Sequence, residues 1–427
     1  MLPFARGSRL TVRIESVAYR GAGIARSGGC VLFVPGACPD ELVEVRVTNV
    51  KPRYAEAEIT ELLEPSPARR APDCRVPAPF GRRGFVRAPG CVYDHLDYAE
   101  EVAVKNGQLL DFLVRGAKSP NAAGLLRQPV PAPRPLHYRN KTVLHAVETR
   151  GGVLLGYIGD DNRSVVDIPQ CPLSVPEIND ALAAFRASPA FRKLRTGDSV
   201  TFRWTPNDGA VHWVNRPLPT QRPLTEHCSF GSVEVPADGF FQVNPWTGAK
   251  LVDAVVNAAR ATNADALVDL YCGVGVFAFA ALAAGIPRAV GVESGWNAVD
   301  SARRNAAALG LGDAKFLCGA VADGIADALA LASDKGGRVC AVVDPPRDGL
   351  EPAALRALCD RRDVDTLVYV SCAPDTLARD LRALLASGYA LSSAQLFDMF
   401  PRTLHFESVC VLSGPSKPAL DSSGEIQ

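Results

Sequence analysis

The stretch that decides the fold class is Leu267-Val268-Asp269-Leu270-Tyr271-Cys272-Gly273-Val274-Gly275-Val276-Phe277-Ala278. Its first four residues are mostly apolar and have the composition of a buried strand, and the residues after Gly275 favour a helix. Glycines between a strand and a helix let the backbone turn tightly and approach a ligand closely. The stretch therefore predicts a strand–turn–helix unit with a binding site at the turn.

Similar apolar, β-branched runs recur on the C-terminal side of this unit, at residues 289–292, 341–343 and 367–370. Stretches rich in Ala, Leu and Arg separate them, and a last strand is expected at residues 406–412. This alternation predicts βαβ units that form a parallel sheet with helices on both faces. We expect this α/β domain to span residues 236–413.

Several chemically active side chains follow the ends of these predicted strands. Glu293 and Asp344 come directly after two of them, Cys372 follows a third after one intervening serine, and Glu407 lies near the start of the last strand. Open α/β sheets bind ligands beyond the carboxyl ends of their strands. We therefore expect these residues to converge with the glycine turn on one crevice.

The glycine turn leaves the identity of its ligand open. The sequence Gly-Val-Gly-Val-Phe-Ala matches the dinucleotide pattern G-x-G-x-x-G/A, which indicates a nicotinamide enzyme. Glu293, 20 residues after Gly273, is placed to bind ribose hydroxyls in either NAD or S-adenosylmethionine. With S-adenosylmethionine, Asp269 would meet the charged methionine portion. A purely structural βα turn is the third interpretation.

A cysteine and a carboxylate beside a methyl donor suggest methylation of uracil at C5. Addition of a thiolate to C6 makes C5 nucleophilic, and a base must then remove the C5 proton. Cys372 suits the first role because a helix N-terminus and nearby positive charge favour the thiolate. Glu407 is the candidate base. A single Cys at a strand end is more often a core residue. The hypothesis therefore rests on Cys372 and Glu407 occurring together beside a site for a methyl donor.

The N-terminal residues 1–64 have a different pattern. Short alternating runs at residues 10–17, 30–34, 42–50 and 55–63 are separated by Gly and Pro. They predict a small OB-like β-barrel, a type of barrel that binds oligonucleotides. A purely structural β-module fits this pattern equally well.

Residues 65–235 predict a central α+β, β-rich domain. A helix is expected at residues 98–115, and strands at residues 141–148, 153–158, 200–204 and 211–214. The domain contains an arginine cluster and the aromatic, basic stretch 137–141, which suit RNA phosphates and bases or simply form a solvated basic face. The cluster consists of Arg69, Arg70, Arg82, Arg83 and Arg87. Residues 414–427 lack periodicity and are expected to be disordered.

Composition excludes several classes of protein. The chain is 47% hydrophobic and 22% charged, which excludes a disordered or fibrous protein. Its 46 Lys and Arg balance 46 Asp and Glu, so RNA binding must use local charge. The longest apolar stretch, residues 276–286, is shorter than the roughly 20 residues that span a bilayer. We expect a cytoplasmic monomer without membrane contacts, and the 12 cysteines are expected to be reduced.

Six motifs resemble the class I RNA uracil-C5 methyltransferases that modify ribosomal or transfer RNA. They are residues 240–244 (FFQVN), 269–273 (DLYCG), 344–347 (DPPR), 369–374 (YVSCAP), 376–380 (TLARD) and 398–408 (DMFPRTLHFES). Residues 10–64 resemble a TRAM domain, the RNA-binding barrel common at the N-terminus of this family. The resemblance covers nearly the whole chain and implies a Rossmann-like methyltransferase domain at its C-terminal end.

The resemblance implies specific roles for individual residues. Cys372 is the expected nucleophile and Glu407 the proton acceptor, acting on a uridine flipped out of the RNA. The expected S-adenosylmethionine and uracil pocket is formed by Gln242, Tyr271, Gly273, Gly275, Glu293 and Asp344. The N-terminal barrel favours 23S ribosomal RNA as substrate, with transfer RNA as the alternative. A nicotinamide-dependent oxidoreductase and a catalytically idle RNA-binding protein remain as more remote alternatives.

The resemblance also extends to a cysteine motif. Many family members bind a [4Fe–4S] cluster through a C-x5-C-x2-C run and a distant fourth Cys. Here Cys74 begins such a run, Cys91 resembles its end after an insertion, and Cys171 fits the distant ligand, but Ala88 occupies the position of the remaining Cys. A standard cluster needs four thiolates, and the presence of only three in this motif argues against one. Either the cluster is absent, or Cys74, Cys91 and Cys171 hold iron with a non-Cys ligand.

Overall fold

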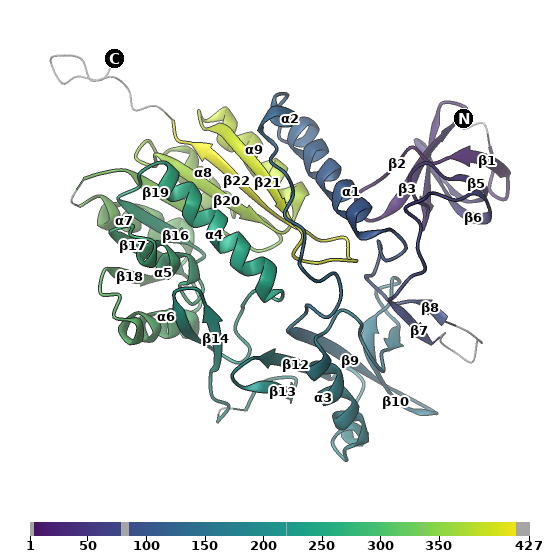
Figure 1. Cartoon of the computed structure of the whole chain (residues 1–427), viewed down its shortest axis with the longest axis horizontal. Helices are drawn as coiled ribbons and strands as arrows, with labels where there is room; N and C mark the ends of the chain where they lie inside the picture. The colour runs from purple at the N-terminus through teal and green to yellow at the C-terminus, as the bar shows by residue number, and fades with distance from the viewer. Residues whose placement is uncertain (1–3, 78–84, 219, 335, 416–427) are drawn as a thin grey trace. The chain divides into compact units, whose positions relative to one another are not determined.

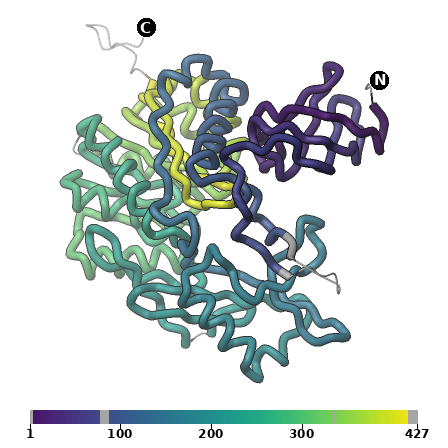
Figure 2. Tube along the Cα trace, turned by 45° about the vertical axis from the view of Figure 1, so that its right-hand side comes forward, coloured from purple at the N-terminus to yellow at the C-terminus, as the bar shows by residue number. Residues whose placement is uncertain are grey.

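The computed structural model describes residues 4–77, 85–218, 220–334 and 336–415 (Figures 1 and 2). Most of the predicted disordered tail, and two arginines of the predicted basic cluster, Arg82 and Arg83, lie outside the described residues. Among the described residues, no helix has both the length and the apolar character needed to span a membrane.

The chain forms two compact units, each built from separate segments. The first unit contains Met1–Gln108, Arg134–Arg203 and Phe400–Phe406. The second unit contains Leu109–Pro133, Trp204–Met399 and Glu407–Gln427. A short loop near the C-terminus, Phe400–Phe406, thus belongs to the unit made otherwise of N-terminal and central residues.

The first unit begins with a six-stranded sheet in the order β1-β5-β6-β4-β3-β2. The strands are β1 (Arg9–Arg13), β2 (Ser16–Val17), β3 (Ala22–Ser27), β4 (Cys30–Pro35), β5 (Leu42–Val50) and β6 (Tyr54–Glu64). Alternating apolar residues such as Val43, Val45 and Val47 point into one core, as the period of two predicts. The predicted runs 30–34, 42–50 and 55–63 are single strands, the run 10–17 is divided between β1 and β2, and β3 is an additional strand that the sequence pattern did not indicate.

The rest of the first unit is mixed. Its elements are β7 (Arg75–Pro77), β8 (Phe85–Arg87), helix α3 (Pro176–Ala187), the short helix η2 (Phe191–Lys193) and the strands β9 (Lys141–Thr149), β10 (Gly152–Ile158), β11 (Val165–Asp167) and β12 (Ser199–Thr205). Helix α1 (Tyr98–Asp111) begins in this unit, and a π-helical turn, η1 (Phe112–Gly116), extends it. The predicted helix at 98–115 and the strands at 141–148, 153–158 and 200–204 are confirmed.

The second unit is built on a seven-stranded sheet in the order β18-β17-β16-β19-β20-β22-β21. The strands are β16 (Ala266–Leu270), β17 (Arg288–Glu293), β18 (Ala314–Cys318), β19 (Val339–Val343), β20 (Thr366–Ser371), β21 (Ala390–Phe397) and β22 (Glu407–Ser413). Every residue of β16, β19 and β20 is buried, which explains their unbroken apolar sequences.

Helices flank this sheet, as predicted (Figure 1). They are α4 (Pro245–Ala261), α5 (Val276–Ala283), α6 (Trp296–Leu309), α7 (Val321–Ser333), α8 (Pro352–Cys359) and α9 (Pro374–Ala386). Helix α5 packs against α4 and the strands β16 to β18, while α7, α8 and α9 contact one another in sequence. The remaining elements of the unit are β13 (Gly209–Val214) and the hairpin of β14 (Leu224–Cys228) and β15 (Gly231–Val235).

The sheet contains two strands, β18 and β21, that the sequence pattern did not indicate, and it also differs from the prediction in the direction of one strand. Strands β18, β17, β16, β19 and β20 are parallel, but β22 runs antiparallel to both β20 and β21. Because of this reversal, the start of β22 lies beside the carboxyl end of β20. The chain leaves β16 toward β17 on one side and returns to β19 on the other, so the ligand crevice of an open α/β sheet is expected beyond β16 and β19.

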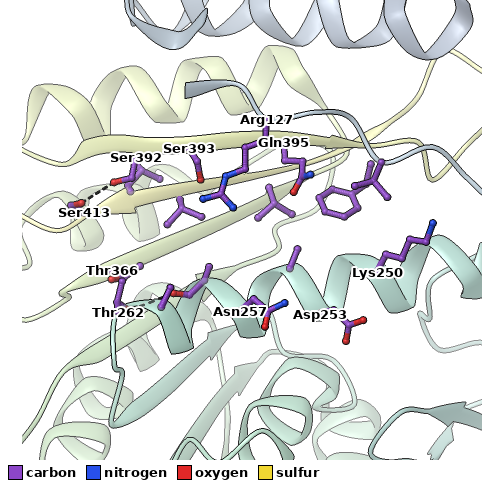
Figure 3. A pocket seen from close by; sticks show the side chains of 18 residues that line it. Arg127, Lys250, Asp253, Asn257, Thr262, Thr366, Ser392, Ser393, Gln395 and Ser413 are labelled. Carbon is purple, nitrogen blue, oxygen red and sulfur yellow. Dashed lines mark hydrogen bonds between the residues drawn. The ribbon is translucent and has the colours of Figure 1, made fainter. Parts of the chain in front are cut away.

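The Pro-rich stretch before residue 135 extends the edge of this sheet. After the short helix α2 (Ala122–Leu125), Arg127 N–H donates to the carbonyl of Ala394, and Val130 N–H donates to Leu396, both at 2.8 Å. Figure 3 shows Arg127 beside Gln395 of β21. A few extended residues have no periodicity of their own, so the sequence pattern does not indicate this pairing.

Candidate active site

The turn after β16 is built from left-handed backbone. Tyr271, Gly273 and Gly275 have φ of 69°, 52° and 93°. A Cβ atom at Gly275 would lie 2.8–2.9 Å from the rings of Phe279 and Phe316. Glycine is therefore required at 275 both by backbone conformation and by close packing.

Glu293 closes this turn from the neighbouring strand β17. One carboxylate oxygen accepts a hydrogen bond from Gly273 N–H at 3.2 Å. The other accepts from Gly295 N–H at 2.7 Å and from the hydroxyl of Ser294 at 3.2 Å. The predicted ribose-binding carboxylate is thus held in a fixed position directly beside the glycine turn.

A cavity of about 130 Å³ opens next to the turn. Four predicted pocket residues line it, namely Gln242, Tyr271, Gly273 and Asp344. Its other walls are mainly apolar and aromatic, and the Tyr271 hydroxyl is buried without a hydrogen-bond partner among the described residues. An apolar cleft with a few convergent polar groups is the usual form of a small-molecule site. Gly275 and Glu293 support the turn and are not among the cavity-lining residues.

The residues around Gln242 are anchored by Asn244, whose role sequence reasoning did not identify. Its side-chain oxygen accepts from Thr247 N–H at 3.3 Å and so caps helix α4. Its side-chain nitrogen donates to the carbonyl of Met399 at 3.2 Å. Asn-Pro at a helix start was the available sequence signal for the cap, but nothing in the sequence pointed to Met399.

Cys372 and Glu407 face each other across β20 and β22. Ser371 pairs with Ser408 in the antiparallel register. Cys372, which follows Ser371, therefore lies opposite Glu407, which precedes Ser408. The electrostatic influence of Glu407, Asp344 and Arg347 on Cys372 also indicates that these groups are close neighbours. The structure therefore brings together the two predicted catalytic residues and the cavity-lining Asp344.

The environment of Cys372 favours the protonated thiol. Its pKa is raised to about 12, chiefly by burial and then by the carboxylates of Glu407 and Asp344, while Arg347 opposes them. This is the reverse of the thiolate-favouring surroundings that a helix N-terminus suggested. The reason is that two carboxylates and burial outweigh one cation and the start of α9.

The two carboxyl groups are also strongly perturbed. Burial raises the pKa of Asp344 to about 7. Burial, and then the charge of Asp344, raise the pKa of Glu407 well above its ordinary value, while Arg347 lowers it. Glu407 is buried, and its Oε2 atom has no hydrogen-bond partner within the described part of the chain. Arg347 is the cation that lowers the pKa of both Cys372 and Glu407. In the sequence it is noticeable only as the last residue of the motif at 344–347.

Asp269 has a different position from the one expected of a cofactor ligand. It is fully buried at the end of β16 and accepts a hydrogen bond from Ala278 N–H of α5 at 3.3 Å. Burial, followed by the charge of Asp344, raises its pKa well above the ordinary value. Asp269 is not among the residues that line the cavity.

A larger hollow of about 700 Å³ lies elsewhere in the second unit (Figure 3). It is bounded by helix α4, with Lys250 and Asn257, and by strands β20 to β22. None of the predicted site residues lines it. Size alone therefore does not identify the functional cavity of this unit.

The three predicted cluster cysteines lie near one another in the first unit. The thiols of Cys74 and Cys91 are hydrogen-bonded, Cys171 is close enough to influence Cys74 electrostatically, and all three residues are buried. Tyr157 donates its hydroxyl proton to the sulfur of Cys171 at 3.4 Å. Ala88 offers no donor atom, and no group of three or more metal-ligating side chains is arranged to hold an ion in the described segments. The residues present do not fit a four-thiolate cluster.

The predicted basic face is partly neutralised. Arg69 forms a bidentate ion pair with the buried Glu41, and Arg70 pairs with Asp73 at 2.7 Å. In the stretch 137–141, Tyr138 is completely buried and donates its hydroxyl proton to the carbonyl of Pro401 at 3.0 Å. Tyr138 is therefore a core residue and cannot stack on RNA bases.

Comparison with known proteins identifies the family of this chain. A family model described as tRNA (uracil-5-)-methyltransferase matches residues 232–414, and a TRAM domain model matches residues 3–60. An uncharacterized RNA methyltransferase of Thermosynechococcus vestitus is 30% identical over 97% of this chain and 100% of its own length. A 23S rRNA (uracil(1939)-C(5))-methyltransferase of Legionella pneumophila is 29% identical over 94% of this chain and 96% of its own length.

A solved structure shows the same fold. The tRNA (uracil-54, C5)-methyltransferase of Pyrococcus abyssi, crystallised with S-adenosyl-L-homocysteine, has a TM-score of 0.69 and 23% sequence identity. The match covers 94% of this chain and 100% of that protein. By these relationships, the chain belongs to the S-adenosylmethionine-dependent RNA (uracil-5-)-methyltransferase family and carries a TRAM domain at its N-terminus.

Proposed function

We propose that the chain methylates C5 of a uridine in 23S ribosomal RNA through a covalent adduct between Cys372 and C6 of the base. The observation that carries this proposal is the placement of Cys372 opposite Glu407, next to the cavity wall that contains Asp344. Transfer RNA is the alternative substrate. The Legionella relative is named for 23S rRNA, whereas the Pyrococcus structure is named for tRNA.

In the proposed first step, the sulfur of Cys372 adds to C6 of the flipped-out uracil. The C5–C6 π electrons move into an enolate, and the thiol proton passes to a neighbouring carboxylate. Asp344, with a pKa of about 7, is suited to receive it near neutral pH. The negative charge that forms on the base benefits from the cation Arg347. When bound, S-adenosylmethionine supplies the methyl group as an electrophilic carbon on sulfur.

In the proposed second step, Glu407 removes the C5 proton. The C5–H electron pair re-forms the C5–C6 double bond, and the C6–sulfur bond breaks to release Cys372. A carboxylate whose pKa is raised by burial is a stronger proton acceptor than one in water. The Oε2 atom of Glu407 has no hydrogen-bond partner among the described residues, so it is available to accept this proton.

The proposal assigns a role to each part of the chain. Residues 1–64 form an OB-like barrel that binds RNA, residues 65–235 form a central RNA-binding domain, and residues 236–413 form the catalytic domain. The apolar residues of the six-stranded sheet form one buried core, as in the interior of a small barrel, and this supports the assignment of residues 1–64. We further propose that the enzyme acts as a cytoplasmic monomer.

The test uses unmodified 23S rRNA and tRNA transcripts, with 5-methyluridine mapped by mass spectrometry. Cys372→Ala should abolish product formation because no other group can open the C5–C6 double bond. The matched control is Cys318→Ala, which removes an exposed cysteine of the same unit that is not among the cavity-lining residues. Product from Cys372→Ala at the wild-type rate would exclude the covalent mechanism.

The role of Glu407 is tested separately. Glu407→Gln keeps the size of the side chain but removes the base, so an enzyme–RNA adduct should accumulate and remain visible on a denaturing gel. Asp344→Asn should not trap the adduct, because Asp344 acts before the methyl group is transferred. Turnover by Glu407→Gln without any adduct would remove Glu407 from the base role.

A further inference from the structure

The loop that carries Asp344 and Arg347 is held by the helix that follows Cys372. This loop, residues 344–351, connects β19 to α8, and helix α9 begins two residues after Cys372. Within it, Gly349 has a φ of 74°. A Cβ atom at Gly349 would lie 2.6 Å from Arg379 and 2.7 Å from Asp380, so the loop and α9 are in close contact.

Two side chains of α9 donate to backbone carbonyls of this loop. The hydroxyl of Thr376 donates to the carbonyl of Arg347 at 3.0 Å. The guanidinium of Arg379 donates to the carbonyls of Asp348 at 3.0 Å and Leu350 at 3.1 Å. These three bonds fix the backbone directly at and after Arg347, although Arg379 itself is about half exposed.

Asp380 completes the arrangement from the buried side. One oxygen accepts from Leu350 N–H at 2.8 Å and from the hydroxyl of Tyr369 at 2.7 Å. The other accepts from Nε of Arg379 at 2.8 Å. Its side chain is fully buried, and charge-assisted hydrogen bonds of this kind are stronger and more directional than neutral ones. Tyr369 lies on β20, two residues before Ser371.

We propose that Arg379 and Asp380 are positioning residues for methyl transfer, a role that rests on the proposed function. They fix the loop carrying Asp344 and Arg347 to the same strand and helix that carry Cys372. The distances among the thiol, the proton acceptor and the cation are thereby set by one hydrogen-bonded network. A displacement of about 1 Å in such a site costs up to about a hundredfold in rate.

The experiment compares full-length variants in kcat, in KM for RNA and in affinity for S-adenosyl-L-homocysteine measured by titration calorimetry. Arg379→Ala should lower kcat at least tenfold, while KM and the affinity change less than threefold, because the RNA surface and the glycine turn are untouched. Arg379→Lys should recover part of kcat, since an ammonium group can still donate to the loop carbonyls. Wild-type kcat in Arg379→Ala would overturn the proposal.

Arg288→Ala is the matched control for a purely structural effect. Arg288 pairs with Asp334 at 3.0 Å and donates to the carbonyl of Gly336 at 2.9 Å in the same unit. It is the first residue of β17, so it lies at the opposite ends of the strands from the cavity. Both alanine variants should show similar losses of thermal stability, but only Arg379→Ala should lose kcat. Equal kcat losses would overturn the positioning role.

Failure of the proposed function would look different. The probe is RNA containing 5-fluorouridine at the target, because fluorine at C5 cannot leave as a proton and the covalent adduct is trapped. If wild-type enzyme forms neither this adduct nor 5-methyluridine, the proposed function is wrong, and 5-methyluridine without the adduct would exclude the covalent mechanism. If wild-type enzyme forms both and Arg379→Ala forms the adduct at the wild-type rate, only the positioning role fails.

Discussion

Cys372, Glu407 and Asp344 each have a raised pKa, and Arg347 is the cation that acts on two of them. Burial penalises every ionised form, and the carboxylates repel one another and the thiolate. The resting site therefore retains protons near neutral pH. In the proposed reaction, Asp344 and Glu407 must therefore each be ionised before they can accept a proton from the thiol or from C5.

Asp344 also gives the protein a specific pH dependence of stability. Its pKa is about 7 in the folded state and 3.8 for the unperturbed group, so the folded state holds the proton more tightly. The resulting stabilisation is fully present below pH 4 and is lost as the pH rises through 7. Asp344→Asn cannot titrate, so its free energy of unfolding should increase relative to wild type between pH 4 and pH 8.

Urea denaturation at several pH values measures this difference. Asp334→Asn is the control, because Asp334 is partly exposed and forms an ion pair with Arg288 remote from the cavity. The difference between wild type and Asp334→Asn should show no comparable rise across this range. A pH-independent difference between wild type and Asp344→Asn would mean that Asp344 ionises normally in the folded protein.

At the level of elements, the loop Phe400–Phe406 is held by a buried charge network within the first unit. Glu101 accepts from Arg402 N–H at 2.6 Å and from its guanidinium at 3.0 Å, and Lys105 also donates to it at 2.8 Å. Lys105 further donates to the carbonyl of Phe400 at 3.2 Å. Both ion pairs are fully buried, and Glu407 follows directly after this loop in the chain.

Removing the Glu101 carboxylate from this network should be costly. Glu101→Gln takes away the carboxylate that pairs with both buried cations, Lys105 and Arg402, which destabilises by about 3–5 kcal/mol. Glu64→Gln breaks the exposed pair with Arg13 and should cost less than about 1 kcal/mol. Urea denaturation compares the two variants, and similar small losses would show that the Glu101 network does not stabilise the loop.

The elements show what sequence patterns can and cannot predict. The strands β16, β17, β19 and β20 were predictable because buried parallel strands have continuous apolar sequences. The antiparallel direction of β22 and the pairing of residues 126–130 with β21 depend on tertiary contacts that no local period encodes. Arg402 adopts a φ of 68°, and a non-Gly residue gives no sequence signal for that conformation.

At the level of the whole molecule, charge is balanced, and part of the predicted basic cluster is committed to ion pairs. Local sequence located Cys372 after one strand and Glu407 at the start of another, but the two are neighbours because β22 runs antiparallel to β20. The partners of Arg69 and Arg70 could not be predicted in this way. Counting positive residues does not reveal that Glu41, 28 positions earlier, neutralises Arg69.

The salt dependence of RNA binding decides whether this cluster contacts phosphates. For single-stranded RNA, each phosphate contact contributes about −0.7 to the slope of log K against log salt concentration. Because Arg69 is engaged by Glu41, Arg69→Ala should leave this slope unchanged while lowering the stability of the first unit. Fluorescence anisotropy with an RNA substrate at several KCl concentrations measures the slope.

Arg53, exposed in the turn between β5 and β6, provides the comparison, since Arg53→Ala should weaken the slope if the TRAM domain binds RNA there. A weaker slope for Arg69→Ala would show that the ion pair opens to bind phosphate.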